Sequence, residues 1–218
     1  MPRRNPARRA ALADAAIRLL PAEGIHGLTH RAVEGVAGLP TGTAANYFRS
    51  REELLVAAAE RAVSLHLEDM ERIDRAVDVS SSPSPLAELI AVSLQDAVTA
   101  SRERYLAIFE LRLEARRRPA LAAALARLGA VASAITADEH RTLGLSVSPE
   151  AIPTLVTLYG GVLFTLVTGP GGVERDVIRR LAHAIVHGAV DATLVDREPS
   201  GLEQRSSDLT DHSRTSTT

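Results

Sequence analysis

The stretch GTAANYFRSREEL, residues 42–54, contains a glycine, two adjacent aromatic residues and a helix start. Tyr47 and Phe48 are two of the six Tyr and Phe residues in this 218-residue chain, which has no Trp. The pattern S-x-x-E that begins at Ser50 is a capping box, in which a hydroxyl and a carboxylate satisfy the first backbone N–H groups of a helix. We therefore predict a short helix over residues 41–48 and a long helix that starts directly after Ser50.

Two more helices are predicted upstream of this stretch. Apolar residues recur at helical spacing after Pro6, a residue suited to the first turn of a helix. Gly24 is a natural terminator, and Thr29 can cap a short helix over residues 30–37. Gly38 then permits a sharp turn before the next helix. Short helices joined by a glycine turn are typical of a helix-turn-helix unit.

Helical periodicity continues through the rest of the chain, and no run of alternating apolar and polar residues indicates a strand. The segment SSSPSP at residues 80–85 and the segment GPGG at residues 169–172 indicate breaks between helices. The long helices are predicted near residues 50–77, 86–101, 103–117, 119–143, 149–168 and 174–195. The predicted fold class is therefore all-α.

Composition and charge divide the chain into three regions. We assign residues 1–50 to a helix-turn-helix domain and residues 51–195 to a larger helical domain. Residues 196–218 are rich in Ser, Thr, Asp, Glu and Arg, and we predict that they form a disordered tail. Residues 1–66 hold nine Arg against six acidic residues, whereas the remainder is acidic overall. A basic module on an acidic body favours anion binding at the N-terminal end.

Composition also limits the classes of protein to consider. The chain has no cysteine, which excludes disulfides and thiolate metal sites. The first nine residues carry four arginines and no apolar signal segment, so we expect a cytoplasmic protein. No phosphate-loop, nucleophile or dinucleotide motif is found, and we expect neither an enzyme nor a bound cofactor.

Two features invite other interpretations. Residues 151–173 contain no charged group, as in a membrane span, but Pro153 and many Thr and Gly residues favour a buried helix at a subunit interface. We therefore expect no membrane association. His183, His187 and Asp191 share one helix face, but three ligands on a single helix do not easily converge on a metal. We therefore predict no metal site.

The side chains around residues 41–51 are suited to DNA. A recognition helix needs short polar or aromatic side chains, and Gly42 allows a phosphate to approach closely. An arginine-rich N-terminal arm can follow the DNA backbone or the minor groove. The candidate DNA-binding residues are Arg4, Thr29, His30, Arg31, Thr41, Gly42, Thr43, Asn46, Tyr47 and Arg51. The alternative is a small helical subdomain with both aromatics in its core, and for Phe48 we favour that interpretation.

The run from Ala10 to Leu55 resembles the DNA-binding domain of the tetracycline-repressor (TetR) family of bacterial transcription regulators. The matching elements are A-x-x-L-L-x-A-E-G over residues 16–24, the cap Thr29, and AGLPTGTAANYFRSREELL over residues 37–55. Over the remaining chain the resemblance is one of architecture alone. It implies long helices, of which the last two pair between subunits.

Four positions depart from the family pattern. Ala45 stands where the family commonly has a Tyr that contacts phosphate, and Glu34 replaces a residue that is usually small. Pro40 stands where Ser or Thr often caps the third helix, and Arg51 replaces a Lys while keeping the charge. These departures leave the expectation of DNA binding in place.

In this family the larger C-terminal domain binds a small molecule and dimerises. The candidate ligand-binding residues are Tyr105, Phe109, Arg112, Leu113, Tyr159 and Phe164. A stripe of small and aliphatic residues on the last two helices suggests an intersubunit four-helix bundle. The candidate interface residues are Leu155, Val162, Leu181, Ile185, Gly188, Ala189 and Ala192. The alternative is that this stripe packs only within its own chain.

The resemblance therefore implies a homodimeric repressor that binds double-stranded DNA at a palindromic operator and is released by an unknown small-molecule effector. One alternative is a regulator of the same fold that has no small-molecule ligand and acts through protein partners. A second alternative is a helical enzyme whose N-terminal helices are only structural, for which we find no convergent acid/base or metal site.

Overall fold

A computed structural model of the chain describes residues 5–76, 82–142 and 150–195. The regular structure of these residues is α-helical throughout, which confirms the predicted fold class. The helices are α1 (Pro6–Gly27), α2 (His30–Ala37), α3 (Thr43–Tyr47), α4 (Arg51–Ala76), α5 (Pro85–Val98), α6 (Arg102–Ala115), α7 (Pro119–Thr142), α8 (Ala151–Thr168) and α9 (Arg175–Val195). The predicted disordered tail, residues 196–218, lies outside the described residues.

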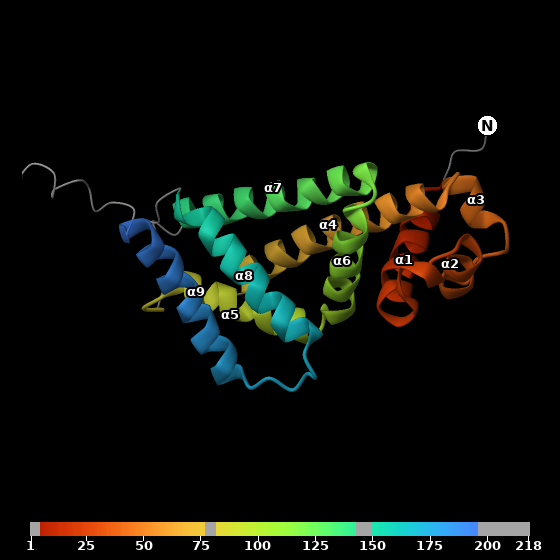
Figure 1. Ribbon diagram of the computed structural model, residues 1–218. Helices are drawn as coiled ribbons and strands as arrows, with labels where there is room; N and C mark the ends of the chain where they lie inside the picture. Colours follow the sequence, from red (N-terminus) through yellow and green to blue (C-terminus); the bar gives the residue numbers. More distant parts are fainter. Residues whose placement is uncertain (1–4, 77–81, 143–149, 196–218) are drawn as a thin grey trace, which may run out of the picture.

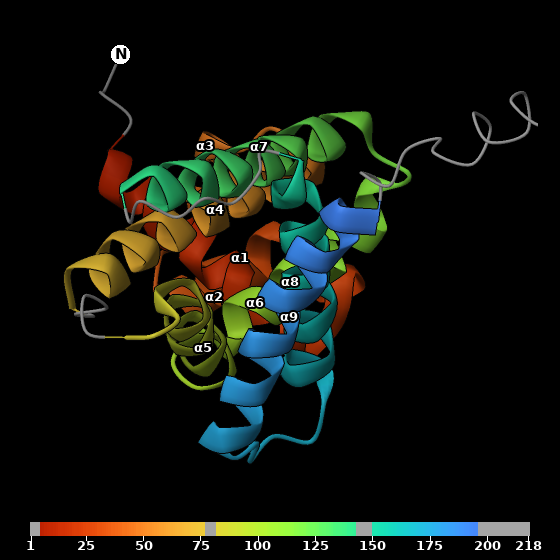
Figure 2. The same ribbon diagram turned by 90° about the vertical axis from the view of Figure 1, so that its left-hand side faces the viewer.

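The helices form a small module at one end of the molecule and a larger body at the other (Figure 1). Helices α1, α2 and α3 make the module, and α4 runs from it into the body beside α7. Helix α1 also packs against α6, while α5, α8 and α9 pack together at the far end, as Figure 2 shows from the side. One continuous apolar core extends from Leu12 in α1 to Ala189 in α9. Module and body therefore share a core.

Local signals fix the start of the two long helices that meet in the module. At the start of α1, the Asn5 Oδ1 atom accepts a hydrogen bond from the Ala7 N–H at 2.9 Å. At the start of α4, the Ser50 Oγ atom accepts from the Glu53 N–H at 3.1 Å, as a capping box requires. Gly24 has φ 63° and bends α1 instead of ending it, so the helix continues one turn beyond the predicted terminator.

Helix α8 is long and apolar enough to cross a membrane by length and composition alone, with a mean hydropathy of 1.7. A core helix of a soluble protein passes the same test. Helix α8 packs against α5, α6, α7 and α9, yet only 28% of its 18 residues are buried. Its outer face includes Leu158 and Phe164, which are 38% and 50% exposed. This apolar face is therefore only partly covered within one chain.

Candidate functional site

The turn between α2 and α3 is fixed by a buried carboxylate. Glu34, in the last turn of α2, is only 3% exposed. Its Oε2 atom accepts a hydrogen bond from the Gly42 N–H at 3.1 Å, and its Oε1 atom accepts one from the Ala44 N–H at 2.6 Å. Gly42 occupies the cap position of α3 with φ 88°, where it supplies no side-chain cap. Glu34 therefore satisfies, from the preceding helix, N–H groups that a Ser or Thr cap would otherwise bind.

Two of the predicted DNA contacts take part in holding α2 in place. The Thr29 Oγ1 atom accepts a hydrogen bond from the Ala32 N–H at 3.1 Å and so caps α2, as predicted. The His30 Nε2 atom donates to the Phe48 carbonyl at 3.0 Å and joins the start of α2 to the end of α3. Phe48 itself is 1% exposed, which confirms its expected place in the core.

The outer face of α3 and the turn before it carry small and polar side chains. Thr41, Gly42, Ala45 and Asn46 are exposed, and Thr43 is partly exposed. The Asn46 Nδ2 group donates to the Gly42 carbonyl at 3.1 Å, which orients the amide and leaves its Oδ1 atom outside this bond. This face has the size and chemistry of a surface that enters a DNA groove.

The Tyr47 hydroxyl lies at the junction of α3 and α1. Its oxygen accepts a hydrogen bond from the Asn5 N–H at 3.2 Å. A phenol can accept and donate at the same time, so the O–H proton remains available for a further acceptor. Arg31, also a predicted contact, is exposed on α2. Arg4 lies outside the described residues.

The Arg51 side chain, predicted to contact a phosphate, binds backbone carbonyls of its own chain. Its Nε atom donates to the Leu28 carbonyl at 2.9 Å, and its Nη2 atom donates to the Ile25 carbonyl. These carbonyls follow the bend in α1, where helix geometry leaves acceptors to be satisfied. The guanidinium therefore joins the start of α4 to the end of α1, and its contact with a phosphate stays a prediction.

Ion pairs connect the module to α4. The Arg61 Nε atom lies 2.8 Å from the Asp14 Oδ1 atom, which joins α4 to α1. This hydrogen bond to Asp14 raises the pKa of Arg61. Arg9 lies with its guanidinium carbon 5.5 Å from the centre of the Phe48 ring and with its Nη2 atom 3.5 Å from Glu60. The orientation of the module therefore depends on the position of α4.

The aromatic residues predicted to bind a ligand have partners inside the body. Phe109 and Phe164 meet edge to face with ring centres 5.0 Å apart. The Tyr105 hydroxyl lies 3.1 Å from the His66 Nδ1 atom, and the Tyr159 hydroxyl lies 2.7 Å from the Ser93 Oγ atom. Burial raises the pKa of both Tyr105 and Tyr159. Both hydroxyls are therefore uncharged at neutral pH.

The remaining predicted ligand residues lie outside the body core. Leu113 is 67% exposed, and Arg112 is exposed beside it on α6. Among the described residues, one cavity of about 320 Å³ lies between α5 and α9 and another of about 310 Å³ lies between α1 and α4. None of the six predicted residues lines either cavity. The exposure of Arg112 and Leu113 shows that helix spacing alone did not identify which side of α6 faces inward. A ligand site formed by the other predicted residues stays a prediction.

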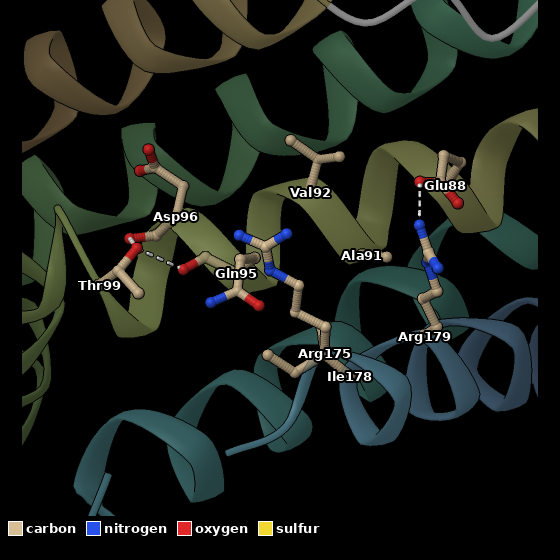
Figure 3. A pocket seen from close by; sticks show the side chains of 9 residues that line it. All are labelled: Glu88, Ala91, Val92, Gln95, Asp96, Thr99, Arg175, Ile178 and Arg179. Carbon is tan, nitrogen blue, oxygen red and sulfur yellow. Dashed lines mark hydrogen bonds and ion pairs between the residues drawn. The ribbon is translucent and has the colours of Figure 1, made fainter. Parts of the chain in front are cut away.

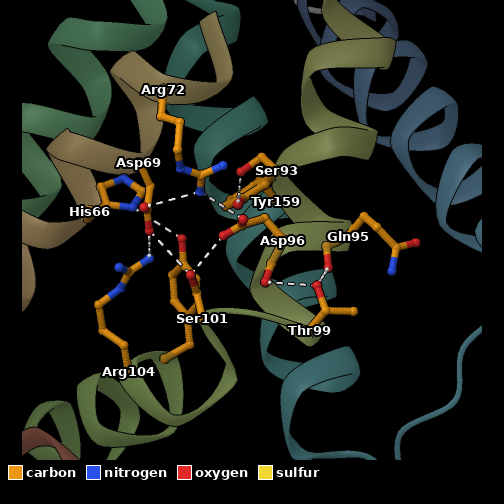
Figure 4. A network of polar contacts seen from close by, with 11 residues as sticks. His66, Asp69, Arg72, Ser93, Gln95, Asp96, Thr99, Ser101, Arg104 and Tyr159 are labelled. Atoms are coloured by element: carbon orange, nitrogen blue, oxygen red, sulfur yellow. Dashed lines mark hydrogen bonds and ion pairs between the residues drawn. The ribbon is translucent and has the colours of Figure 1, made fainter. Parts of the chain in front are cut away.

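A polar network connects α4, α5 and α6 at the centre of the body (Figure 4). Asp69 of α4 forms an ion pair with Arg104 of α6, which is 8% exposed. The Arg72 Nη2 atom lies 3.2 Å from Asp69 and 2.8 Å from Asp96 of α5. The Ser101 hydroxyl donates to Asp96 at 2.7 Å. Burial raises the pKa of Asp69, but the hydrogen bonds and charges of Arg104 and Arg72 outweigh it and keep that pKa below its usual value.

His66 borders this network and is 9% exposed. Burial and, to a smaller extent, the nearby Arg104 charge lower its pKa to about 4, against an opposing effect of Asp69. Its imidazole is therefore neutral at pH 7 and forms its hydrogen bond with Tyr105 in the uncharged form. Sequence spacing gave no signal for this network, because its members come from three helices.

The stripe predicted for subunit contact lies largely inside its own chain. Leu155, Ile185 and Ala189 are 4%, 2% and 0% exposed. Val162 and Leu181 are partly buried, and a side chain at Gly188 would meet the Leu158 Cδ1 atom at 3.2 Å. The side chain of Ala192 lies outside the described residues. We therefore correct the assignment of Leu155, Ile185 and Ala189, because the same periodicity packs α9 onto α5 and α8 of one chain. Contacts of Val162, Leu181 and Gly188 with a second subunit stay a prediction.

The outward face of α8 and α9 carries other residues. Leu158, Phe164, His183, Ala184 and His187 are exposed there. Within the residues whose side chains are described, no group of three or more His, Asp or Glu side chains is placed to bind a metal ion. The side chain of Asp191, the third member of the predicted stripe, is outside that set.

Comparison with known proteins yields one family and several similar structures. Residues 81–192 match the family model described as the C-terminal domain of tetracyclin repressor-like proteins. No curated protein sequence is significantly similar to the chain. The multidrug binding protein EbrR complexed with ethidium is 27% identical, with a TM-score of 0.61. The alignment covers 82% of this chain and 98% of that one. A TetR-family member from Streptomyces coelicolor A3 is 26% identical, with a TM-score of 0.60. That alignment covers 82% of this chain and 97% of the other.

Proposed function

Because the chain belongs to the tetracycline-repressor (TetR) family of transcriptional regulators, we propose that it is a ligand-responsive repressor. It binds a palindromic operator as a homodimer and is released when a small molecule binds its body. It acts in the cytoplasm and is not an enzyme. The observation that carries this proposal is the α2–α3 unit, in which Glu34 fixes the turn and the exposed face of α3 offers groups suited to DNA.

The proposed contacts to the DNA backbone come from both ends of α3. Gly42 lets a phosphate approach the start of the helix, because it has no side chain in the way. Thr41 and Thr43 flank it in the chain, and the Thr41 hydroxyl is the proposed donor, because the Thr43 hydroxyl already donates to the Pro40 carbonyl. At the other end the free O–H of Tyr47 donates to a second phosphate, and exposed Arg31 on α2 supplies a positive charge.

The proposed base contacts come from the middle of α3. Asn46 can offer its side-chain oxygen to a base donor. Ala45, where the family commonly has a Tyr, exposes a methyl group that is suited to the methyl of thymine. Thr29 and His30 are retained as positioning residues, since each already binds the protein backbone.

Two copies are needed to read two half-sites in successive major grooves. The outward face of α8 and α9, which includes the exposed side chains of Leu158 and Phe164, is the proposed contact between them. Burial of this face in a dimer also accounts for an apolar helix that is only 28% buried in one chain. A subunit interface over α8 therefore explains why this helix is as apolar as a membrane span.

Release requires that the body and the DNA module be coupled. Helix α4 is the proposed link, because Arg61 and Arg51 join it to α1 at one end and Asp69 and Arg72 join it to the network at the other. A ligand that shifts α4 lowers DNA affinity, and DNA lowers ligand affinity by the same factor. The 27% identical protein EbrR, complexed with ethidium, supports a small organic molecule as effector.

A gel-shift and footprinting experiment on the DNA next to the gene tests this proposal. We expect sequence-selective binding that weakens as salt rises, because phosphate contacts release counterions. Tyr47→Phe removes one proposed phosphate contact and is expected to weaken binding about tenfold. Tyr159→Phe, in the body, is the control and is expected to bind DNA as the wild type does. Equal binding to every DNA sequence, with no effect of Tyr47→Phe, would contradict the proposal.

A further inference from the structure

The cavity between α5 and α9 has the size of a small-molecule site. Its volume is about 320 Å³, near the lower end of the range for ligand pockets. Figure 3 shows its lining side chains, which come from both helices. Ala91 and Val92 of α5 and Ile178 of α9 form an apolar strip. A small flat or branched organic group fits such a strip.

Gln95 contributes an unsatisfied acceptor to this cavity. Its side-chain Oε1 atom is buried and accepts no hydrogen bond from any described residue. Buried polar atoms in proteins nearly always have a partner, so an unpaired one in a cavity wall indicates a donor that binds there. The missing partner is an O–H or N–H group.

Arg175, the first residue of α9, contributes an unpaired positive charge. Its guanidinium lines the cavity, and no carboxylate among the described residues pairs with it. The other arginine of the lining, Arg179, lies 3.5 Å from Glu88, and the second acid, Asp96, is paired with Arg72. The remaining charge of the cavity is therefore positive, which selects an anion.

We propose that the α5–α9 cavity binds a small organic acid, with its carboxylate on Arg175 and an O–H or N–H group on the Oε1 atom of Gln95. The guanidinium binds a carboxylate through two parallel hydrogen bonds, and the apolar strip covers the hydrocarbon part of the acid. A neutral or cationic ligand of the same size leaves Arg175 unpaired. The site is separate from the aromatic pairs of α6 and α8.

The same cavity borders the link to α4. Asp96 lines it, while the Asp96 carboxylate also binds Arg72 of α4 at 2.8 Å and Ser101 at 2.7 Å (Figures 3 and 4). An acid in the cavity therefore lies next to the contact that joins α5 to α4. Resting on the proposed function, we infer that the bound acid changes operator affinity through this contact.

Binding is tested by calorimetry on the full chain without DNA. The probes are 2-, 3- and 4-hydroxybenzoate, with benzoate and phenol for comparison. We expect at least one hydroxybenzoate to bind more tightly than benzoate, and phenol to bind least. Arg175→Ala should weaken hydroxybenzoate binding about tenfold or more. Arg180→Ala is the matched control, because Arg180 is also an exposed arginine of α9 but does not line the cavity.

A second variant separates the two proposed contacts. Gln95→Leu should remove the preference for hydroxybenzoate over benzoate while benzoate still binds. The proposal is overturned if no hydroxybenzoate binds at millimolar concentration, or if Arg175→Ala and Arg180→Ala bind it equally. Because this measurement contains no DNA, its failure leaves the proposed repressor function intact. Adding the acid to the operator assay tests regulation, and unchanged DNA affinity in the presence of bound acid overturns that part.

Discussion

Glu34 shows how one side chain positions a recognition helix. Its carboxylate accepts the N–H groups of Gly42 and Ala44 and is buried at the junction of α2 and α3. A Gln in its place keeps one acceptor but turns an NH₂ group toward the second N–H. One buried donor would then be unsatisfied, at a cost of about 1–3 kcal/mol.

We therefore predict that Glu34→Gln lowers the free energy of unfolding by about 1–3 kcal/mol and weakens operator binding about tenfold or more. Chemical denaturation and fluorescence anisotropy measure the two effects. Glu23→Gln, an exposed position on α1, is the control and should change neither. Operator affinity that is unchanged in Glu34→Gln would show that this carboxylate does not position α3.

At the residue scale, the sequence predicted what depends on near neighbours in the chain. Thr29 as a cap, Ser50 as the start of a capping box and Phe48 in the core are all confirmed. Glu34 could be recognised only as an unusual residue, because its partners lie eight and ten positions away across a turn. The backbone carbonyls that Arg51 binds could not be predicted, because their position depends on how α1 bends.

At the scale of elements, the network between α4, α5 and α6 determines how firmly the body is joined to α4. Asp69 and Arg104 form its buried ion pair. Removal of one partner leaves the other charge buried and unpaired, which typically costs about 3–5 kcal/mol. Replacement of both partners removes the unpaired charge.

We predict that Asp69→Asn lowers the free energy of unfolding by about 3–5 kcal/mol and that adding Arg104→Met recovers much of the loss. Urea denaturation of the two single variants and the double variant measures the coupling. Glu71→Gln breaks an exposed pair with Arg75 on the same helix and should cost at most about 0.5 kcal/mol. Additive losses in the double variant would contradict a direct pairing.

His66 should make the stability of the body depend on pH. Above pH 6.5 the imidazole is neutral in both the folded and the unfolded state and adds no pH dependence. Below pH 6.5 the unfolded state takes up a proton, while the folded state does so only near its pKa of about 4. The free energy of unfolding therefore falls as the pH drops through this window, by about 3 kcal/mol in total.

His66→Gln keeps a hydrogen-bonding group beside Tyr105 but cannot titrate in this range. Between pH 6.5 and 4, the unfolding free energy of the wild type should fall by about 3 kcal/mol more than that of His66→Gln. Denaturation curves at several pH values measure the difference, and the comparison cancels the other titrating groups. His26→Gln, exposed on α1, should follow the wild type. Parallel curves for His66→Gln and the wild type would exclude a depressed pKa at His66.

The helices themselves were predictable because periodicity, caps and glycine turns act locally, and the predicted segments lie close to the observed α1 to α9. The side of each helix that faces a partner was not predictable. Leu155, Ile185 and Ala189 follow a spacing that suits a dimer and a single-chain core equally well, and the structure buries them in the core. The division of the chain at residue 50 stays a prediction, since one apolar core extends across it.

At the scale of the whole molecule, the exposed face of α8 provides a test of dimerisation. Phe164 is 50% exposed and belongs to the proposed subunit contact, while one edge of its ring packs against Phe109 of α6. A carboxylate there would be buried without a partner in a dimer, so we expect Phe164→Glu to shift the protein toward monomers. Sedimentation equilibrium measures the mass, with Ala126→Glu on the exposed side of α7 as control. A Phe164→Glu protein that dimerises like the control would place the interface elsewhere.

The whole molecule also sets the geometry of DNA recognition, because two α3 helices in one dimer must meet two half-sites. Selection from a random duplex library, followed by measurement of stoichiometry and affinity for the enriched sequence, tests this most directly. We predict a palindrome bound by an even number of chains, with half-site centres a whole number of helical turns apart. Tyr47→Phe should weaken binding to it about tenfold. Enrichment of no sequence, or of a sequence without two-fold symmetry bound by single chains, would contradict the central claim.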